Sequence, residues 1–224
     1  MNFSGSLTKK EALAALLYLP VHMLLLPLLM LYLSKNGVAD DPVLVFGQYA
    51  VGAVYMLIML GGFLRREFDA LCDRPFRSIL TVIGAYLGTM YLTVLAGLLL
   101  QLVPGTNLNN AAVADMATEN MGVTAATAVF LAPLVEEPIF RAGIFGQLRK
   151  KNRALAYAVG ALAFSLYHVV GYAGQNPLYL IYAVQYIPAS LMLMLCYEKT
   201  NSLWSSIFLH MLINGVSLNL LGSL

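Results

Sequence analysis

Seven long apolar segments dominate this chain, and about 20 mostly apolar residues are what an α-helix needs to cross a bilayer. Only helices and closed barrels can span a membrane, because backbone polar groups find no water there. Hydrophobic residues make up 60% of the 224 residues and charged residues only 11%, whereas a soluble domain is about one quarter charged. The sequence therefore predicts an all-α polytopic membrane helix bundle that forms one domain, residues 1–224. Its seven transmembrane helices are expected near 12–33, 43–64, 78–102, 123–147, 154–171, 178–196 and 203–222.

The connections between these segments alternate in charge. Lys9 and Lys10 precede the first segment, four arginines lie in 65–77, and 149–153 reads RKKNR. The connections that alternate with these carry Asp40 and Asp41, or acidic residues without a basic one in 103–122. Positively charged connections remain cytoplasmic, so we expect a cytoplasmic N-terminus. No basic block is long enough to indicate a nucleic-acid partner.

One apolar segment contains three charged residues. The stretch LAPLVEEPIFRAGIF, residues 131–145, holds Glu136, Glu137 and Arg141. Each charge at mid-bilayer costs about 2.5–3.5 kcal/mol, and such residues normally face the bundle interior and serve a function. Glu137 and Arg141 are four positions apart and can therefore pair on one helix face. Glu136 has no basic residue at these spacings, so we expect its partners on other helices.

Few polar residues elsewhere in the apolar segments could be those partners. His168 lies in the fifth segment, and His210 lies in the seventh with Asn214 four positions later. Each is a polar group in lipid that needs a partner, and one interior pocket that holds them all is the least costly arrangement. His22, in the first segment, has no polar neighbour within a helical turn, and we interpret it as structural or interfacial.

These residue types indicate hydrolysis of an amide by activated water. A glutamate held away from bulk water can act as a general base, and a histidine beside it can orient the water and share its proton. A second histidine and an asparagine amide are donors suited to a developing oxyanion. Two histidines and a carboxylate could also hold zinc. We prefer a site without metal or other cofactor, because the H-x-x-x-N pair offers one weak ligand.

Three motifs in the second half of the chain resemble those of a known family. EEPIFR fits E-E-x-x-x-R, FSLYH fits F-x-x-x-H, and HMLIN fits H-x-x-x-N. In this order they resemble the CAAX-protease and bacteriocin-processing (Abi) family, which includes the type II prenyl-protein endopeptidases. The resemblance covers a motif-bearing core of about 122–220. It implies an intramembrane glutamate endopeptidase in which Glu136 and His168 activate water, His210 and Asn214 stabilise the oxyanion, and Glu137 with Arg141 supports the site.

The resemblance leaves the substrate open and allows one other function. Its expected partners are membrane lipid and a peptide or protein substrate, which can be lipidated. The alternative is a non-catalytic membrane immunity or regulatory protein of the same family. By analogy alone, we expect a prokaryotic plasma membrane and a peptide precursor such as a bacteriocin leader. An ion-coupled carrier is disfavoured by the odd number of spans and the lack of repeated halves.

Overall fold

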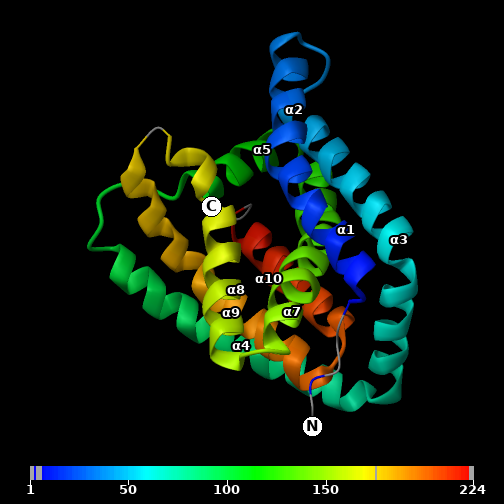
Figure 1. Cartoon of the computed structure of the whole chain (residues 1–224). Coiled ribbons are helices and arrows are strands. Elements are labelled where there is room, and N and C mark those ends of the chain that lie inside the picture. The colour runs from blue at the N-terminus through cyan, green and yellow to red at the C-terminus, as the bar shows by residue number, and fades with distance from the viewer. Residues whose placement is uncertain (1–2, 4–6, 175, 222–224) are drawn as a thin grey trace.

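Helices are the only regular elements in residues 3, 7–174 and 176–221, which the computed structural model describes. The first half contains α1 (Lys9–Pro20), η1 (Val21–Leu25), α2 (Leu26–Lys35), α3 (Asp41–Asp73), α4 (Pro75–Leu100) and α5 (Leu108–Ala125). The central part contains η2 (Ala126–Leu131), α6 (Ala132–Glu137), η3 (Pro138–Phe145) and α7 (Gly146–Arg149). The last part contains α8 (Arg153–Tyr167), η4 (Val170–Tyr172), η5 (Pro177–Tyr186), α9 (Ile187–Thr200) and α10 (Leu203–Leu221). The predicted all-α membrane bundle is confirmed (Figure 1).

Five helical stretches among the described residues are long and apolar enough to cross a membrane. They are Lys9–Lys35, Asp41–Asp73, Pro75–Leu100, Leu108–Arg149 and Pro177–Thr200. The predicted span 154–171 is wrong in length, because α8 ends at Tyr167 after 15 residues and turns follow it. The predicted span 203–222 corresponds to α10, and its last residue lies outside the described ones. The number seven and the orientation of the N-terminus therefore stay predictions.

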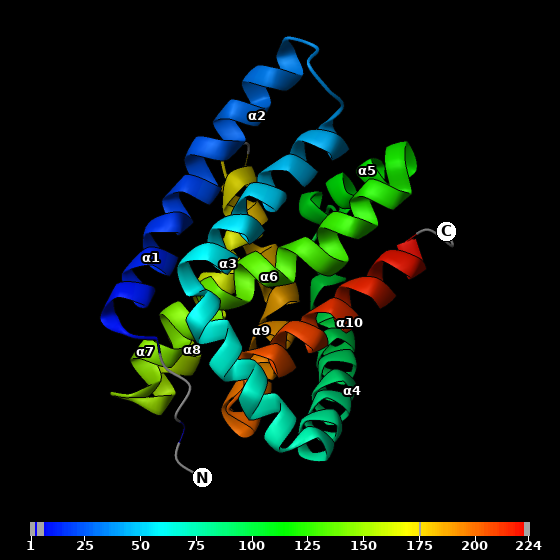
Figure 2. The same cartoon turned by 90° about the vertical axis from the view of Figure 1, so that its right-hand side faces the viewer.

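The ends of the helices alternate between the two ends of the bundle. The α3–α4 connection and the α7–α8 connection lie toward the lower end in Figure 1, and the α2–α3 connection lies at the upper end. Figure 2 shows the same alternation from the side. The connections rich in Lys and Arg thus share one end of the molecule. This arrangement is the one that the alternating charges require of a polytopic protein.

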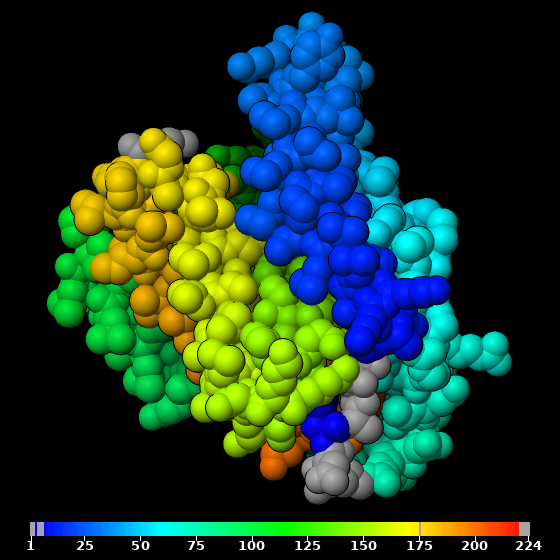
Figure 3. All heavy atoms as spheres, viewed as in Figure 1, coloured from blue at the N-terminus to red at the C-terminus, as the bar shows by residue number. Residues whose placement is uncertain are grey.

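The stretch Leu108–Arg149 lies at the centre of the bundle. More than half of its apolar part is buried inside the protein, against a third or less in the other four candidate spans. Val135, Ala142 and Phe145 have no exposed surface, and α1, α3, α8 and α10 pack around this stretch. By contrast, α2 buries none of its residues and stands above the rest of the surface (Figure 3). The charged motif is therefore placed where lipid does not reach it.

The two prolines of the central stretch are accommodated by π-helical turns. Pro133 and Pro138 lack an N–H and crowd the preceding turn, which predicts a bend and free carbonyls. The chain instead widens into π-helix over η2, before Pro133, and over η3, which starts at Pro138. A π-helix pairs residues five apart and often occurs at functional sites. The helix therefore continues past both prolines, and the turn before Pro133 presents a free carbonyl, described below.

The polar connection 103–122 is more ordered than its composition predicts. Its polar composition predicts a surface loop with a short helix after Asn109 or Asn110, whereas the structure has the 18-residue α5. Asn107 begins it, since its side chain accepts hydrogen bonds from the backbone N–H groups of Asn109 and Asn110, a common way to start a helix. At Asn120 the backbone leaves helical geometry (φ −153°, ψ 86°). This kink separates the polar first part of α5 from the turn that leads into η2.

Candidate active site

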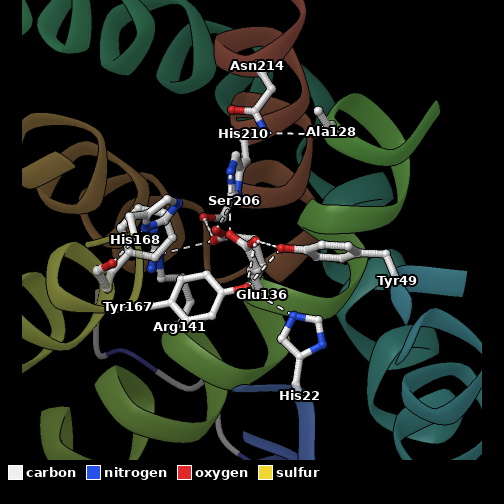
Figure 4. A network of polar contacts seen from close by, with 12 residues as sticks. His22, Tyr49, Ala128, Glu136, Arg141, Tyr167, His168, Ser206, His210 and Asn214 are labelled. Carbon is white, nitrogen blue, oxygen red and sulfur yellow. Dashed lines mark hydrogen bonds and ion pairs between the residues drawn. The ribbon is translucent and has the colours of Figure 1, made fainter. Parts of the chain in front are cut away.

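The four predicted catalytic residues line one cavity of about 760 Å³. Glu136 reaches it from α6, His168 from the end of α8, and His210 and Asn214 from α10. These residues are separated by up to 78 positions in the sequence, and the packing of α10 against α6 brings them to one interior space (Figure 4). The expectation of one interior pocket that holds these residues agrees with this arrangement.

Glu137 does not line the cavity and instead stabilises the site from the protein interior beside it. Its side chain has no exposed surface, and Arg141 Nε lies 3.2 Å from its Oε2. The same carboxylate accepts a 2.6 Å hydrogen bond from Ser206 Oγ and a 2.8 Å bond from His210 Nδ1. The predicted pairing of Glu137 with Arg141 is therefore present. Two groups of α10 join it, so this carboxylate fixes α10 to the motif helix.

Arg141 is held mainly by charge and by an aromatic ring. It is fully buried, and none of its guanidinium nitrogens makes a directed hydrogen bond to a described residue. Its Cζ lies 4.1 Å from the centre of the Phe164 ring, where the negative face of an aromatic ring attracts a cation. Phe164 also contacts the rings of His168 and His210, at 4.6 and 5.8 Å between centroids. The phenylalanine of F-x-x-x-H thus connects the support pair with both histidines.

Glu136 presents its two oxygens to different surroundings. Oε1 lies 3.0 Å from the hydroxyl of Tyr49, which donates to it, and 3.5 Å from that of Tyr167. Oε2 is buried without a hydrogen-bond partner among the described residues, 3.9 Å from His210 Nε2. Burying a carboxylate oxygen without a hydrogen-bond donor costs free energy, and a molecule in the cavity that donates to it would remove this cost. Oε2 is therefore the oxygen available to a water or a substrate.

His168 is fixed by the end of its own helix. It is the residue at which α8 stops, where backbone carbonyls have no intrahelical donor. Its Nδ1 lies 2.8 Å from the carbonyl oxygen of Phe164 and donates to it, since a carbonyl can only accept. In the neutral ring the lone pair then remains on Nε2. Tyr186 stacks on the ring at 4.3 Å and 18°, so the free nitrogen of His168 has a fixed direction.

His210 and Asn214 are each committed to one partner behind the cavity. His210 uses Nδ1 on Glu137, so Nε2 is its free nitrogen. Asn214 donates Nδ2–H to the carbonyl of Ala128 at 2.8 Å (Figure 4). In the π register the N–H of residue 133 would bond this carbonyl, but Pro133 has none. Asn214 therefore supplies the hydrogen-bond donor that Pro133 lacks, and its second amide proton remains available to the cavity.

Four contact residues of this site were not identified from the sequence as contributing to it. Ser206 lies four positions before His210, and this i, i+4 spacing could have indicated it. Tyr167 directly precedes His168. Tyr49 and His22 carry no such signal, because their partners are more than 80 positions away. His22 is only 1% exposed, so its interpretation as interfacial is wrong.

The zinc alternative can be compared with the arrangement of potential ligands. Within the part of the chain that the structure describes, no three His, Cys, Asp or Glu side chains are arranged to hold a metal ion. In addition, Nδ1 of His168 and Nδ1 of His210 are each engaged by an acceptor of the protein.

The comparison with protein families matches this part of the chain. Residues 118–216 match the family model described as type II CAAX prenyl endopeptidase Rce1-like. The match confirms the resemblance drawn from the three motifs and agrees closely with the predicted core of about 122–220. It includes Glu136, His168, His210 and Asn214 and leaves out α1 to α4. Neither the curated proteins nor the solved structures gave a match.

Proposed function

We propose that this integral membrane protein, whose residues 118–216 belong to the Rce1-like family of type II CAAX prenyl endopeptidases, is an intramembrane endopeptidase that works without metal. In this proposal water, and not a side chain, attacks the peptide carbonyl. The observation that carries the proposal is Glu136 Oε2, a buried carboxylate oxygen to which no described residue donates, in a cavity that both histidines line.

The proposed reaction begins with a water between Glu136 Oε2 and His168 Nε2. Both atoms accept hydrogen bonds, so the water donates both protons and turns its lone pair toward the substrate carbonyl. Glu136 takes one proton as the water oxygen bonds to the carbonyl carbon. The carbon–nitrogen bond then breaks, and the amine leaves with the proton that Glu136 returns. The fixed positions of both acceptors favour this step, because correct placement of reactants removes much of the barrier.

The oxyanion needs donors, and the site offers two. Asn214 has a second amide proton, since the first is used on Ala128. His210 Nε2 donates only when both ring nitrogens carry protons, because Nδ1 already donates to Glu137. Nε2 of this ring lies 3.9 Å from Glu136 Oε2, and Nδ1 lies 2.8 Å from Glu137 Oε1. A charged donor aimed at a developing oxyanion is among the largest contributions to catalysis.

The cavity lining indicates a substrate class. It is mostly apolar or neutral, with methionines, prolines, threonines, asparagines and tyrosines, and it contains no Lys or Arg among the described residues. A free carboxylate inside this space would meet the anionic Glu136 and no Lys or Arg side chain of the described residues. The proposed substrate is therefore a peptide or lipidated protein tail whose segment in the cavity is neutral. By analogy alone, we propose a prokaryotic plasma membrane as its location.

Cleavage of a quenched peptide panel by the purified protein in detergent tests this function. The panel contains lipidated and unlipidated peptides, and the reaction is repeated with a strong chelator. We expect cleavage by the wild type and by Glu119→Gln, an exposed glutamate of α5, with or without chelator. Glu136→Gln should lose it by at least about 10³-fold, because the base is absent.

Other outcomes lead to different conclusions. Full activity of Glu136→Gln contradicts the proposed mechanism, and loss of wild-type activity with chelator indicates a metal site. Absence of cleavage for every peptide favours the non-catalytic immunity or regulatory alternative.

A further inference from the structure

Three side chains that the family motifs do not specify form a hydrogen-bonded chain behind Glu136. Tyr49 donates to Glu136 Oε1 at 3.0 Å, and its hydroxyl oxygen lies 2.9 Å from that of Tyr167. The hydroxyl of Tyr167 lies 3.0 Å from His22 Nε2. Figure 4 shows Tyr49, Tyr167 and His22 converging on Glu136 from three different elements: α3, the end of α8 and η1.

The chain has one direction of donation. The single proton of Tyr49 points to the carboxylate, so the proton of Tyr167 serves the 2.9 Å contact with Tyr49 and the longer 3.5 Å contact with Oε1. The oxygen of Tyr167 must then accept from His22, which carries its proton on Nε2. Each group thus donates to the next, and hydrogen bonds aligned in this way strengthen one another. All of them end on Oε1, the oxygen that the proposed reaction does not use.

The far end of the chain is firmly held. His22 is 1% exposed and lies in the π-helix η1, and its own carbonyl accepts a 3.0 Å bond from Gln48 Nε2. The ring contacts Tyr49 edge-on at 4.8 Å and Tyr18 at 5.7 Å. Its Nδ1 is buried without a hydrogen-bond partner in the described part of the chain. A polar ring placed so deeply in an apolar bundle has a cost that packing alone does not explain.

We propose that His22 is a positioning residue for peptide hydrolysis and acts on Glu136 through Tyr167 and Tyr49. The chain holds Oε1 against α3 and α8, so that Oε2 faces the cavity and the attacking water. The inference rests on the proposed function, since it takes Glu136 as the base. It gives η1 and α3, which lie outside the matched residues 118–216, a part in the chemistry.

Kinetic analysis of four variants tests this role. We expect Tyr49→Phe and His22→Phe to lower kcat by about 10-fold to 100-fold, the usual effect of losing a hydrogen bond to a charged group. KM should change much less than kcat, because the removed groups act on Glu136 Oε1 and not on the scissile peptide. His22→Gln places an N–H donor near the position of Nε2 and should restore most of the rate. The matched control is Tyr55→Phe, which removes a hydroxyl of α3 that donates to Ala14 O, away from Glu136.

Infrared spectroscopy tests the same chain without a substrate. The carboxyl band of protonated Glu136 is identified by subtracting the spectrum of Glu136→Gln. We expect this band to move to higher wavenumber in Tyr49→Phe and His22→Phe and to stay in place in Tyr55→Phe. An unmoved band in the first two variants, or unchanged kcat in both, overturns the inference. If the wild type cleaves no peptide but the band moves, the proposed function fails and the positioning of Glu136 stands.

Discussion

Removal of the Arg141 guanidinium should destabilise the protein strongly. In Arg141→Met the side chain keeps much of its length, but Glu137 loses the cation at 3.2 Å, and the Phe164 ring loses the charge over its face at 4.1 Å. Both partners of the ion pair have no exposed surface, so water cannot replace the lost charge. We therefore expect the variant to fold less stably in detergent and in membranes.

The size of the effect follows from burial. Removing one partner of a buried ion pair costs about 3–5 kcal/mol, and a desolvated cation–π contact adds up to about 2 kcal/mol. Ser206 and His210 still donate to Glu137, so we expect the lower end, about 3–4 kcal/mol. For a chain of this size, 1 kcal/mol corresponds to about 2–4 °C in Tm. The unfolding midpoint should therefore fall by about 6–16 °C.

Thermal unfolding in detergent, followed by circular dichroism, measures this change. The matched control is Arg66→Met, which removes an exposed arginine that pairs with Glu11 at 3.1 Å. Exposed pairs contribute about 0–1 kcal/mol, so the control should lose less than about 4 °C. The double variant Glu137→Gln, Arg141→Met removes both charges and should be no less stable than Arg141→Met. Equal midpoints for Arg141→Met and Arg66→Met would refute the reasoning.

Two further predictions concern packing and the freed carbonyl. Gly52→Ala should lower Tm, because a Cβ there would lie 2.7 Å from the Tyr18 hydroxyl; overpacking costs about 1–3 kcal/mol. Gly61→Ala meets open space and should leave Tm unchanged or slightly raised, and equal losses at both positions would contradict this account. Asn214→Leu leaves the carbonyl of Ala128 without its donor, so both kcat and Tm should fall; an unchanged kcat would remove Asn214 from the oxyanion site.

Local spacing predicted the support pair but not the environment of the proposed base. Glu137 and Arg141 share a helix face at i, i+4, and this relation holds in any helix. Glu136 is bonded to Tyr49, which lies 87 positions earlier, and no periodicity reports contacts between distant segments. The sequence could show only that Glu136 lacked a partner on its own helix. Which tyrosine supplies the donor depends on how α3 packs against α6.

The helices were predicted from apolar length, and this criterion fails where geometry departs from the regular α-helix. The apolar sequence extends the predicted fifth span to residue 171. In the structure α8 ends at Tyr167, and the His168 side chain donates a hydrogen bond back to the carbonyl of Phe164. The π turns at η2 and η3 were also not predicted, since proline indicates a disturbed helix without specifying its form. The partner of Asn214 followed from that π register and could not be identified beforehand.

The central claim is that Glu136 acts as the base whereas Glu137 stabilises the structure. One paired measurement tests this claim most directly. Glu136→Gln and Glu137→Gln are compared for kcat and for Tm on the same preparation. We predict that Glu136→Gln loses cleavage by at least about 10³-fold with Tm almost unchanged, whereas Glu137→Gln loses several degrees in Tm because a fully buried ion pair is broken. Cleavage that survives in Glu136→Gln would contradict the account.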